Sequence, residues 1–287
     1  MTLHVYGVVD GQVFVMSDSR TTDRKSGTIV DTTNKVATYP LTEDDGWADA
    51  VTVGGIEPGD FAAVLMVAGR SSFTPEAITG EPSPQKVEAI DIVKRALTGS
   101  YANVEELGDA VWDEITEAWC AACATCRALW GERQEEDARR FASFDAQPDD
   151  AEVSEGEFCE SHESSDDSDP GIVLLVAAVN DPRYPAGACF MKTWDGNARD
   201  RHLNDRVVEF SAPREAEEVA IGDEFTDEDL RGLIAEKFRA VARPDSGGSD
   251  LDMAASPGIG GPIRTIVLDP TAGFRWLQSF DLEARDR

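Results

Sequence analysis

The chain carries, over residues 2–22, the stretch TLHVYGVVDGQVFVMSDSRTT, and this stretch decides the fold. Two short runs rich in β-branched residues, 3–9 and 12–17, are separated by Asp10-Gly11. An Asp-Gly pair between two such runs is the strongest short-range signal for a β-hairpin. The sequence therefore predicts that the fold begins with an antiparallel strand pair.

The rest of the chain predicts blocks of strands and blocks of helices. Strands are expected at 28–39 (a pair), 51–55, 172–179, 188–194 and 263–268, and helices at 59–68, 86–97, 103–141 and from Thr226 to about 241. The last helix has a threonine cap with an acid three residues later, and Pro244 follows its end. Because helices do not alternate with single strands, the order favours an α+β fold with helices packed outside stacked sheets.

The 287 residues are interpreted as one domain, 1–287. The segment from about 142 to 170 differs from its surroundings, because acidic residues and serines dominate it. Such a composition cannot bury a core, so this segment is interpreted as an exposed acidic insertion.

The charge balance restricts the partners. Asp and Glu number 56 against 26 Lys and Arg, a net charge of -30. A surface of this sign repels nucleic acid and anionic membranes. The imbalance is interpreted as an acid-rich solubility device of the kind expected in high salt, and binding of basic partners is the alternative.

No run of 18 apolar residues and no secretory signal pattern occurs in the sequence. We therefore expect no membrane partner, a cytoplasmic location and reduced cysteines.

The N-terminal segment resembles a β-type subunit of the proteasome and its bacterial relatives. The matching residues are Thr2, Gly7-Val8-Val9, Asp10-Gly11 and above all Ser17-Asp18-Ser19-Arg20-Thr21-Thr22. In that family a nucleophilic threonine stands sixteen residues before the aspartate of this motif, as Thr2 stands before Asp18. Lys35-Val36 matches the family's lysine with one extra residue between, and Val51–Gly55 is similar to the strand that ends in the oxyanion-hole glycine, here Gly55.

The C-terminal half resembles the family more loosely. Ser211 stands where a serine of the site is expected, although the glycines that should precede it are absent. Asp245 lies at the expected distance from Thr226, and Ser249 is the nearest matching serine, offset by one, with Ser256 as a competitor.

The resemblance implies a four-layer αββα sandwich and a proteasome-like threonine peptidase without cofactor or metal. Thr2 would become the N-terminal nucleophile after removal of Met1, and its own α-amine would be the base. Lys35, held by Asp18, would favour the neutral amine, and Asp245, Ser249 and Ser211 would position it. The Gly55 N–H would stabilise the oxyanion, and Thr21 and Thr22 would hold a peptide by strand addition. The implied partners are a peptide or unfolded protein substrate, further copies in a homo-oligomeric ring, and an ATPase.

Other interpretations stay open. Each residue has a structural explanation: Thr2 could start a strand, Asp18 could lie in a surface turn, and Lys35 could be a solvated charge. The chain could also be a catalytically inactive scaffold subunit of the same fold. Cys120, Cys123 and Cys126 could bind metal, although their steps of three on a predicted helix match no standard zinc pairing. His4 and His202 have no convincing partner.

Overall fold

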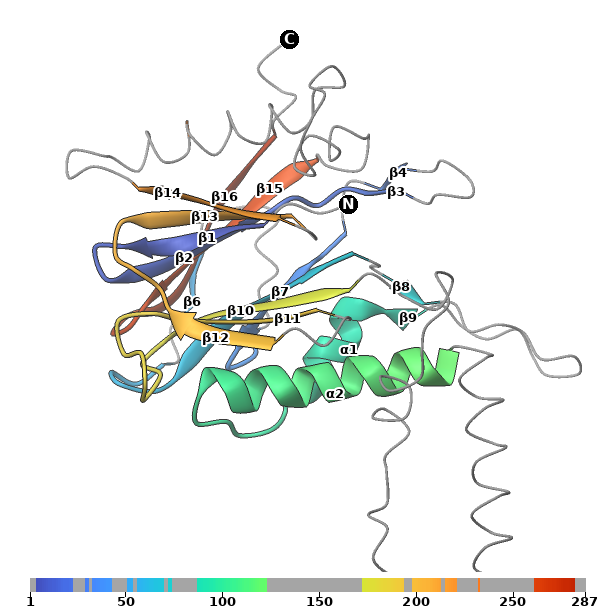
Figure 1. The fold of residues 1–287 in the computed structure, drawn as a ribbon. Helices are drawn as coiled ribbons and strands as arrows, with labels where there is room; N and C mark the ends of the chain where they lie inside the picture. Colours follow the sequence, from blue (N-terminus) through green and yellow to red (C-terminus); the bar gives the residue numbers. More distant parts are fainter. Residues whose placement is uncertain are drawn as a thin grey trace, which may run out of the picture.

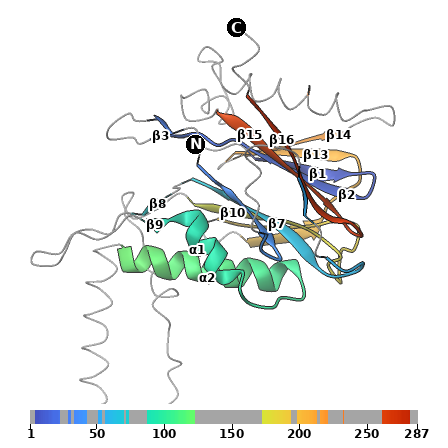
Figure 2. The same ribbon diagram turned by 180° about the vertical axis from the view of Figure 1, so that it is seen from behind.

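In the computed structural model, the described residues are 4–22, 29–30, 33–42, 51–53, 56–69, 72–73, 87–122, 172–193, 198–212, 215–220, 232 and 261–281. They form two stacked antiparallel sheets and a pair of helices (Figures 1 and 2).

The predicted N-terminal hairpin is confirmed. Strand β1 (His4–Val9) pairs with β2 (Gln12–Ser17) in a register that sets His4 opposite Ser17. Asp10 and Gly11 have φ values of 51° and 76°. Positive φ at both central residues suits a tight two-residue connection between twisted strands, which explains the Asp-Gly pair.

The hairpin lies inside a seven-stranded sheet of order β14-β13-β1-β2-β15-β16-β6. The other members are β6 (Val51–Val53), β13 (Val207–Ala212), β14 (Glu215–Ala220), β15 (Pro262–Asp269) and β16 (Gly273–Asp281). The predicted last strand is β15, which pairs with β2 along 264–268. The sheet thus joins the two ends of the chain.

A second sheet of five strands has the order β12-β11-β10-β7-β5. Its members are β5 (Val36–Tyr39), β7 (Ala62–Ala68), β10 (Val173–Val179), β11 (Ala188–Thr193) and β12 (Ala198–His202). The predicted pairing of 172–179 with 188–194 is confirmed. The helix predicted over 59–68 is wrong, because Ala62–Ala68 is a central strand buried on both faces.

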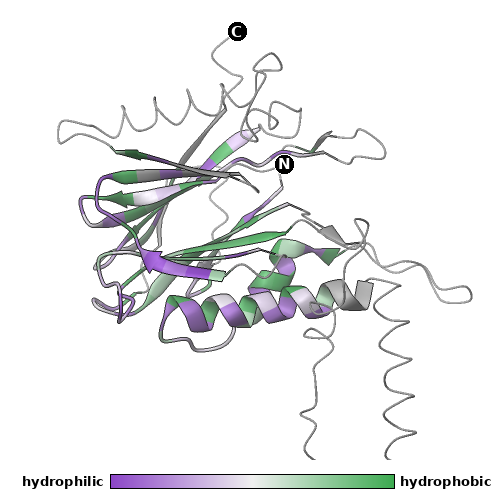
Figure 3. Ribbon diagram, viewed as in Figure 1, coloured by the Kyte–Doolittle hydropathy of each residue, from purple (hydrophilic) through white to green (hydrophobic). Residues whose placement is uncertain are grey.

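The two sheets face each other across an apolar layer (Figure 3). Alternate residues of each strand supply this layer, as the two-residue period of a strand requires. Tyr6, Val8, Val13, Val15, Ile266 and Leu268 come from the seven-stranded sheet, and Val64, Met66, Leu175 and Ala177 from the five-stranded sheet.

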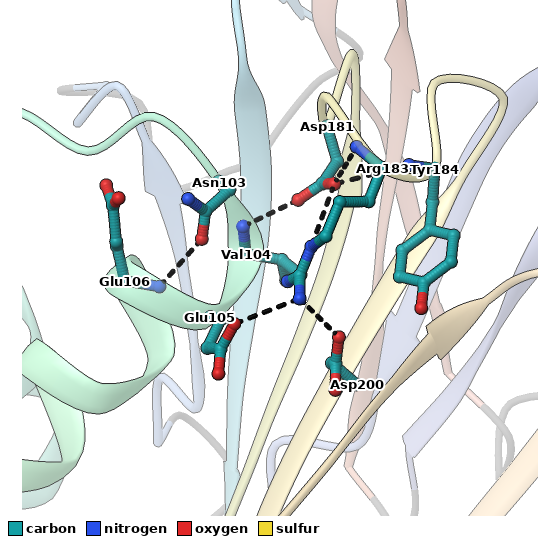
Figure 4. A network of polar contacts seen from close by, with 8 residues as sticks. All are labelled: Asn103, Val104, Glu105, Glu106, Asp181, Arg183, Tyr184 and Asp200. Carbon is teal, nitrogen blue, oxygen red and sulfur yellow. Dashed lines mark hydrogen bonds and ion pairs between the residues drawn. The ribbon is translucent and has the colours of Figure 1, made fainter.

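Helices α1 (Ala89–Ala96) and α2 (Val104–Ala122) cover the outer face of the five-stranded sheet. A second apolar cluster joins them to that sheet, with Leu107, Val111 and Ile115 of α2 fully buried. The buried carboxylate of Asp181 accepts the Val104 N–H at 2.8 Å and so caps the start of α2 (Figure 4). No described helix is long and apolar enough to cross a membrane.

Two short ribbons complete the described strands. Strand β3 (Thr21–Thr22) pairs with β4 (Ile29–Val30), and β8 (Ser72–Phe73) with β9 (Val87–Glu88). Both strands predicted within 28–39 are present as β4 and β5, but their pairing with each other is wrong, since β4 pairs with β3 and β5 pairs with β7.

The αββα fold class is also wrong for the part of the chain that the structure describes. That part is mostly β-sheet, with two helices that cover one sheet only. One physical reason is the 62–68 run, which adds a strand instead of a helix. The helix predicted from Thr226 lies outside the described residues except for Gly232. The whole acidic insertion and the end of the helix predicted to 141 also lie outside them.

Candidate active site

The candidate site lies where the two sheets meet at the ends of β2 and β5. Asp18 directly follows β2 of the seven-stranded sheet, and Lys35 directly precedes β5 of the five-stranded sheet. The Lys35 Nζ lies 3.1 Å from Asp18 Oδ1 and 3.0 Å from Asp18 Oδ2. A pair seventeen residues apart in sequence thus ties one sheet to the other.

Three further hydrogen bonds hold Lys35 in place. Its ammonium donates to the Arg20 carbonyl at 2.6 Å, in addition to the two carboxylate oxygens of Asp18. The Lys35 carbonyl accepts the Val67 N–H at 3.0 Å, and the Thr33 N–H donates to the Ser19 carbonyl at 3.0 Å. The segments 18–20 and 33–35 therefore form one bonded unit.

Burial dominates the electrostatics of the pair. Asp18 is 1% exposed and Lys35 is 3% exposed. Burial lowers the pKa of Lys35, and the carboxylate of Asp18 opposes that change. Burying an ion pair costs several kcal/mol per ion in desolvation, roughly, so packing alone does not explain its presence. An amine held in this way can supply a fixed positive charge or exchange a proton.

His4 is a second buried polar group near the pair. Its side chain is fully buried, and burial together with the charge of Lys35 lowers its pKa to about 3. The imidazole is therefore neutral near pH 7. The Val67 backbone lies close enough to oppose the lowering of this pKa slightly, but neither ring nitrogen makes a hydrogen bond of ordinary geometry within the described portion. Sequence reasoning set His4 aside because a lone histidine in a strand gives no signal of its surroundings.

Arg264 is a buried cation that sequence reasoning missed. It lies on β15 opposite Ser17, the residue before Asp18, and is 2% exposed. Its only sequence signal is an arginine inside an apolar strand that reads Ile-Arg-Thr-Ile-Val-Leu.

The other predicted site residues are placed only in part. Thr21 lies in the β3 ribbon opposite Val30, and its buried hydroxyl has no hydrogen-bond partner among described residues. Thr22 lies beside it on the same strand. Ser211 lies on β13 with its backbone opposite His4. Thr2, Gly55, Asp245 and Ser249 lie outside the described residues. The structure therefore brings together Asp18, Lys35 and His4, with the Ser211 backbone beside His4.

The proposed metal cysteines are not tested by the structure. Cys120 lies in α2 without a described side chain, and Cys123 and Cys126 lie outside the described residues. Within the described ranges, no group of three His, Cys, Asp or Glu could hold a metal ion.

Comparison with known proteins gives a likeness of structure only. No protein-family model matches the chain, and no curated protein matches it. The Anbu (Gly-1) mutant from Hyphomicrobium sp. strain MC1 is 12% identical and aligns over 100% of this chain and 91% of that chain, with a TM-score of 0.46. Anbu (ancestral beta-subunit) from Yersinia bercovieri is 11% identical over 98% of this chain and 89% of its own, with a TM-score of 0.43.

These findings overturn the sequence-based assignment to the β-type proteasome subunits. The structures named above are Anbu proteins, and identities of 11–12% with TM-scores below 0.5 do not make this chain a β-subunit. The short N-terminal motif misled the assignment, because a few residues at the right spacing do not extend over a whole chain. No residue role follows from a likeness at this level.

Proposed function

We propose that the chain is a threonine-type peptidase whose nucleophile is the N-terminal Thr2, exposed by removal of Met1. The observation that carries the proposal is the buried Lys35, fixed by Asp18 and the Arg20 carbonyl. An ammonium held in this way can keep a nearby α-amine neutral by charge repulsion, so that the amine can act as the base.

Chain geometry supports the identity of the nucleophile. Strand β1 begins at His4, which lies opposite Ser17, the last residue of β2. Asp18 directly follows Ser17, so His4 lies beside the start of the Asp18 segment. The charge of Lys35 acts on the His4 ring. Thr2 precedes His4 by two residues in the sequence, and two residues of extended chain span at most about 7 Å, so we propose that Thr2 reaches this pair.

In the proposed reaction, the α-amine of Thr2 takes the proton from its own hydroxyl, and Oγ attacks the scissile carbonyl. Lys35 favours the neutral amine by charge repulsion. The Gly55 N–H would stabilise the oxyanion, while Asp245, Ser249 and Ser211 would orient the amine. The C–N bond then breaks, the leaving amine takes the proton, and water hydrolyses the ester on Thr2. Thr21 and Thr22 would pair with the substrate backbone.

The wider assignment is also proposed. Peptides or unfolded proteins are the substrates, the 287 residues form one domain with an exposed acidic insertion, and copies of the chain assemble into a ring, which an ATPase could feed. Sedimentation velocity on the purified protein tests the assembly, and a monomer would contradict it.

The first test is whether Thr2 reacts. Intact mass of the native protein should lack Met1, and a peptide epoxyketone, which bonds both a hydroxyl and the α-amine of one residue, should add one equivalent at Thr2. Thr2→Ala should abolish labelling, and Lys35→Ala should slow it at least a hundredfold, on the order of the contribution of one acid–base group.

A matched control is Lys192→Ala, which removes a lysine that pairs with Asp109 at 3.3 Å, away from the site. Its labelling rate should stay within twofold of the parent. Retained Met1, or a Thr2 that no electrophile labels in folded protein, would reject the peptidase and favour the inactive scaffold subunit.

A further inference from the structure

Arg264 is a buried cation whose inward-facing neighbours along β15 are apolar. Ile266 and Leu268, two and four residues further along β15, belong to the cluster between the sheets. The alternation of a strand puts Arg264 on the same face, at the end nearest Asp18. A buried charge is costly unless its contacts compensate for lost water, so an aliphatic residue here would serve packing better.

The contacts of Arg264 lead to the lysine segment. Its Cζ lies 4.8 Å from the centre of the Trp276 ring, over the ring face. Its Nη1 donates to Oδ1 of Asn34, the residue before Lys35. The same Asn34 oxygen accepts the N–H of Val36, the residue after Lys35, at 3.0 Å. One amide oxygen therefore joins the guanidinium to the backbone on both sides of Lys35.

We propose that Arg264 is a positioning residue for Lys35, acting through Asn34, in the reaction proposed above. Trp276 fixes the plane of the guanidinium, the guanidinium fixes the Asn34 amide, and the Asn34 amide fixes the turn into β5. With this turn fixed, the Lys35 side chain is held in the one conformation that contacts both Asp18 and the Arg20 carbonyl. This inference rests on the proposed function for its kinetic part only.

The guanidinium suits this role better than an ammonium. Its planar fork can lie on an aromatic ring and still direct an N–H at a neighbouring oxygen in the plane. A lysine at 264 would keep the charge but lose the fixed direction. A methionine would keep most of the volume and lose both.

The experiment compares Arg264→Met, Arg264→Lys and Asn34→Ala with the parent enzyme. Peptide hydrolysis gives kcat and KM, and NMR of protein with ¹³C-labelled lysine gives the Lys35 signal, one of six lysines. We expect kcat to fall at least tenfold in all three variants with KM within threefold. We expect the Lys35 titration to move up toward that of an exposed lysine, because a loosened turn admits water.

The double variant Arg264→Met/Asn34→Ala should be little worse than either single variant, since both break one chain of contacts. Recovery of full kcat in Arg264→Lys would overturn the proposal, because charge alone would then suffice. If Arg264→Met does not fold, Asn34→Ala decides, since it leaves the guanidinium and its ring contact in place.

Arg201→Met is the matched control, because Arg201 also links the two sheets, through Glu209, but lies far along the sheet order from β5. It should lower the melting temperature and leave kcat and the Lys35 signal unchanged. If Arg264→Met lowers the melting temperature but leaves kcat and the Lys35 signal unchanged, Arg264 serves packing only and the proposal is wrong. If the parent itself shows no hydrolysis, the proposed function fails. The positioning role would still be upheld if the titration of the Lys35 NMR signal moves in both Arg264→Met and Asn34→Ala.

Discussion

At the scale of single residues, His4 shows what the space between the sheets imposes on a polar side chain. The ring is fully buried and its two nitrogens make no hydrogen bond of ordinary geometry with described residues. Burial disfavours the charged form, and the nearby ammonium of Lys35 disfavours it further. The folded protein therefore holds His4 neutral at a pH where an unfolded histidine is charged.

His4→Leu should make the protein less sensitive to acid. With a folded pKa of about 3 against 6.5 for the ordinary group, the unfolded state binds the extra proton, so stability falls as the pH drops from about 7 toward 3. Between pH 7.5 and pH 5 this accounts for about 2 kcal/mol of lost unfolding free energy. Urea unfolding at both pH values measures the difference, which should shrink by that amount in His4→Leu.

His202→Leu removes a histidine from an exposed position and is the control. The loss of unfolding free energy between pH 7.5 and pH 5 should be the same in this variant as in the parent. An unchanged drop in His4→Leu would mean that His4 is not held neutral in the fold.

Sequence reasoning reached Asp18 and Lys35 through motifs that resemble those of the proteasome β-type subunits, and the structure places the two side chains in contact, while their catalytic roles stay predictions. It could not reach His4 or Arg264. Each stands singly in an apolar strand, and only the partner strand reveals its neighbours: Ser17 faces both, His4 from β1 and Arg264 from β15. Such cross-strand neighbours depend on sheet order, which local sequence does not contain.

At the scale of elements, the join between α2 and the five-stranded sheet depends on close approach. Asp181 follows β10 and accepts N–H groups from Val104, Arg183 and Tyr184, which fixes the loop against the start of the helix (Figure 4). Arg183 adds exposed ion pairs to Glu105 and Asp200. Exposed pairs contribute little, so the buried carboxylate carries this join.

Gly108→Ala should destabilise the protein although alanine is the better helix former. Alanine in a helix gains about 1 kcal/mol over glycine. At 108, however, a Cβ would lie 2.4 Å from two ring carbons of Phe190, which is 2% exposed on β11. Overpacking of that kind costs about 1–3 kcal/mol. The urea midpoint should fall, whereas Gly232→Ala, at a helical position with open space, should raise it or leave it unchanged.

The 62–68 strand shows where periodicity fails. The run Ala-Ala-Val-Leu-Met-Val-Ala is apolar at every position, so it has neither the period of a helix nor that of a half-buried strand. Both of its faces are covered, one by the other sheet and one by the helices. In contrast, the hairpin at 4–17 carried its own turn signal in Asp10-Gly11 and was predicted with its boundaries nearly right.

At the scale of the whole molecule, two sheets held together by apolar packing are also joined by one buried and one partly exposed ion pair. Lys35 meets Asp18 at the end of β5, and Arg201 meets Glu209 at the opposite edge strand, β12. The stacking of sheets was predictable from strand content, but the layer count was not, because it required knowing which apolar segments are helices.

The net charge of -30 determines how the stability of the folded chain depends on salt. Like charges on one surface repel one another and disfavour the compact state. Added salt shortens the range of that repulsion, from about 10 Å at 0.1 M to about 3 Å at 1 M. We therefore expect the melting temperature to rise steeply with KCl up to about 1 M and to level off beyond it.

A variant with Glu57→Gln, Asp60→Asn and Glu117→Gln separates screening from other effects of salt. The three side chains are exposed, so their replacement should change packing little and remove three negative charges. The variant should be more stable than the parent by a few tenths of a kcal/mol at low salt, with a gain that shrinks as KCl increases. A melting temperature that does not change with KCl, or that rises equally in parent and variant, would contradict this prediction. Charge repulsion would then not be what salt weakens, and binding of a basic partner would be the better explanation of the acid-rich surface.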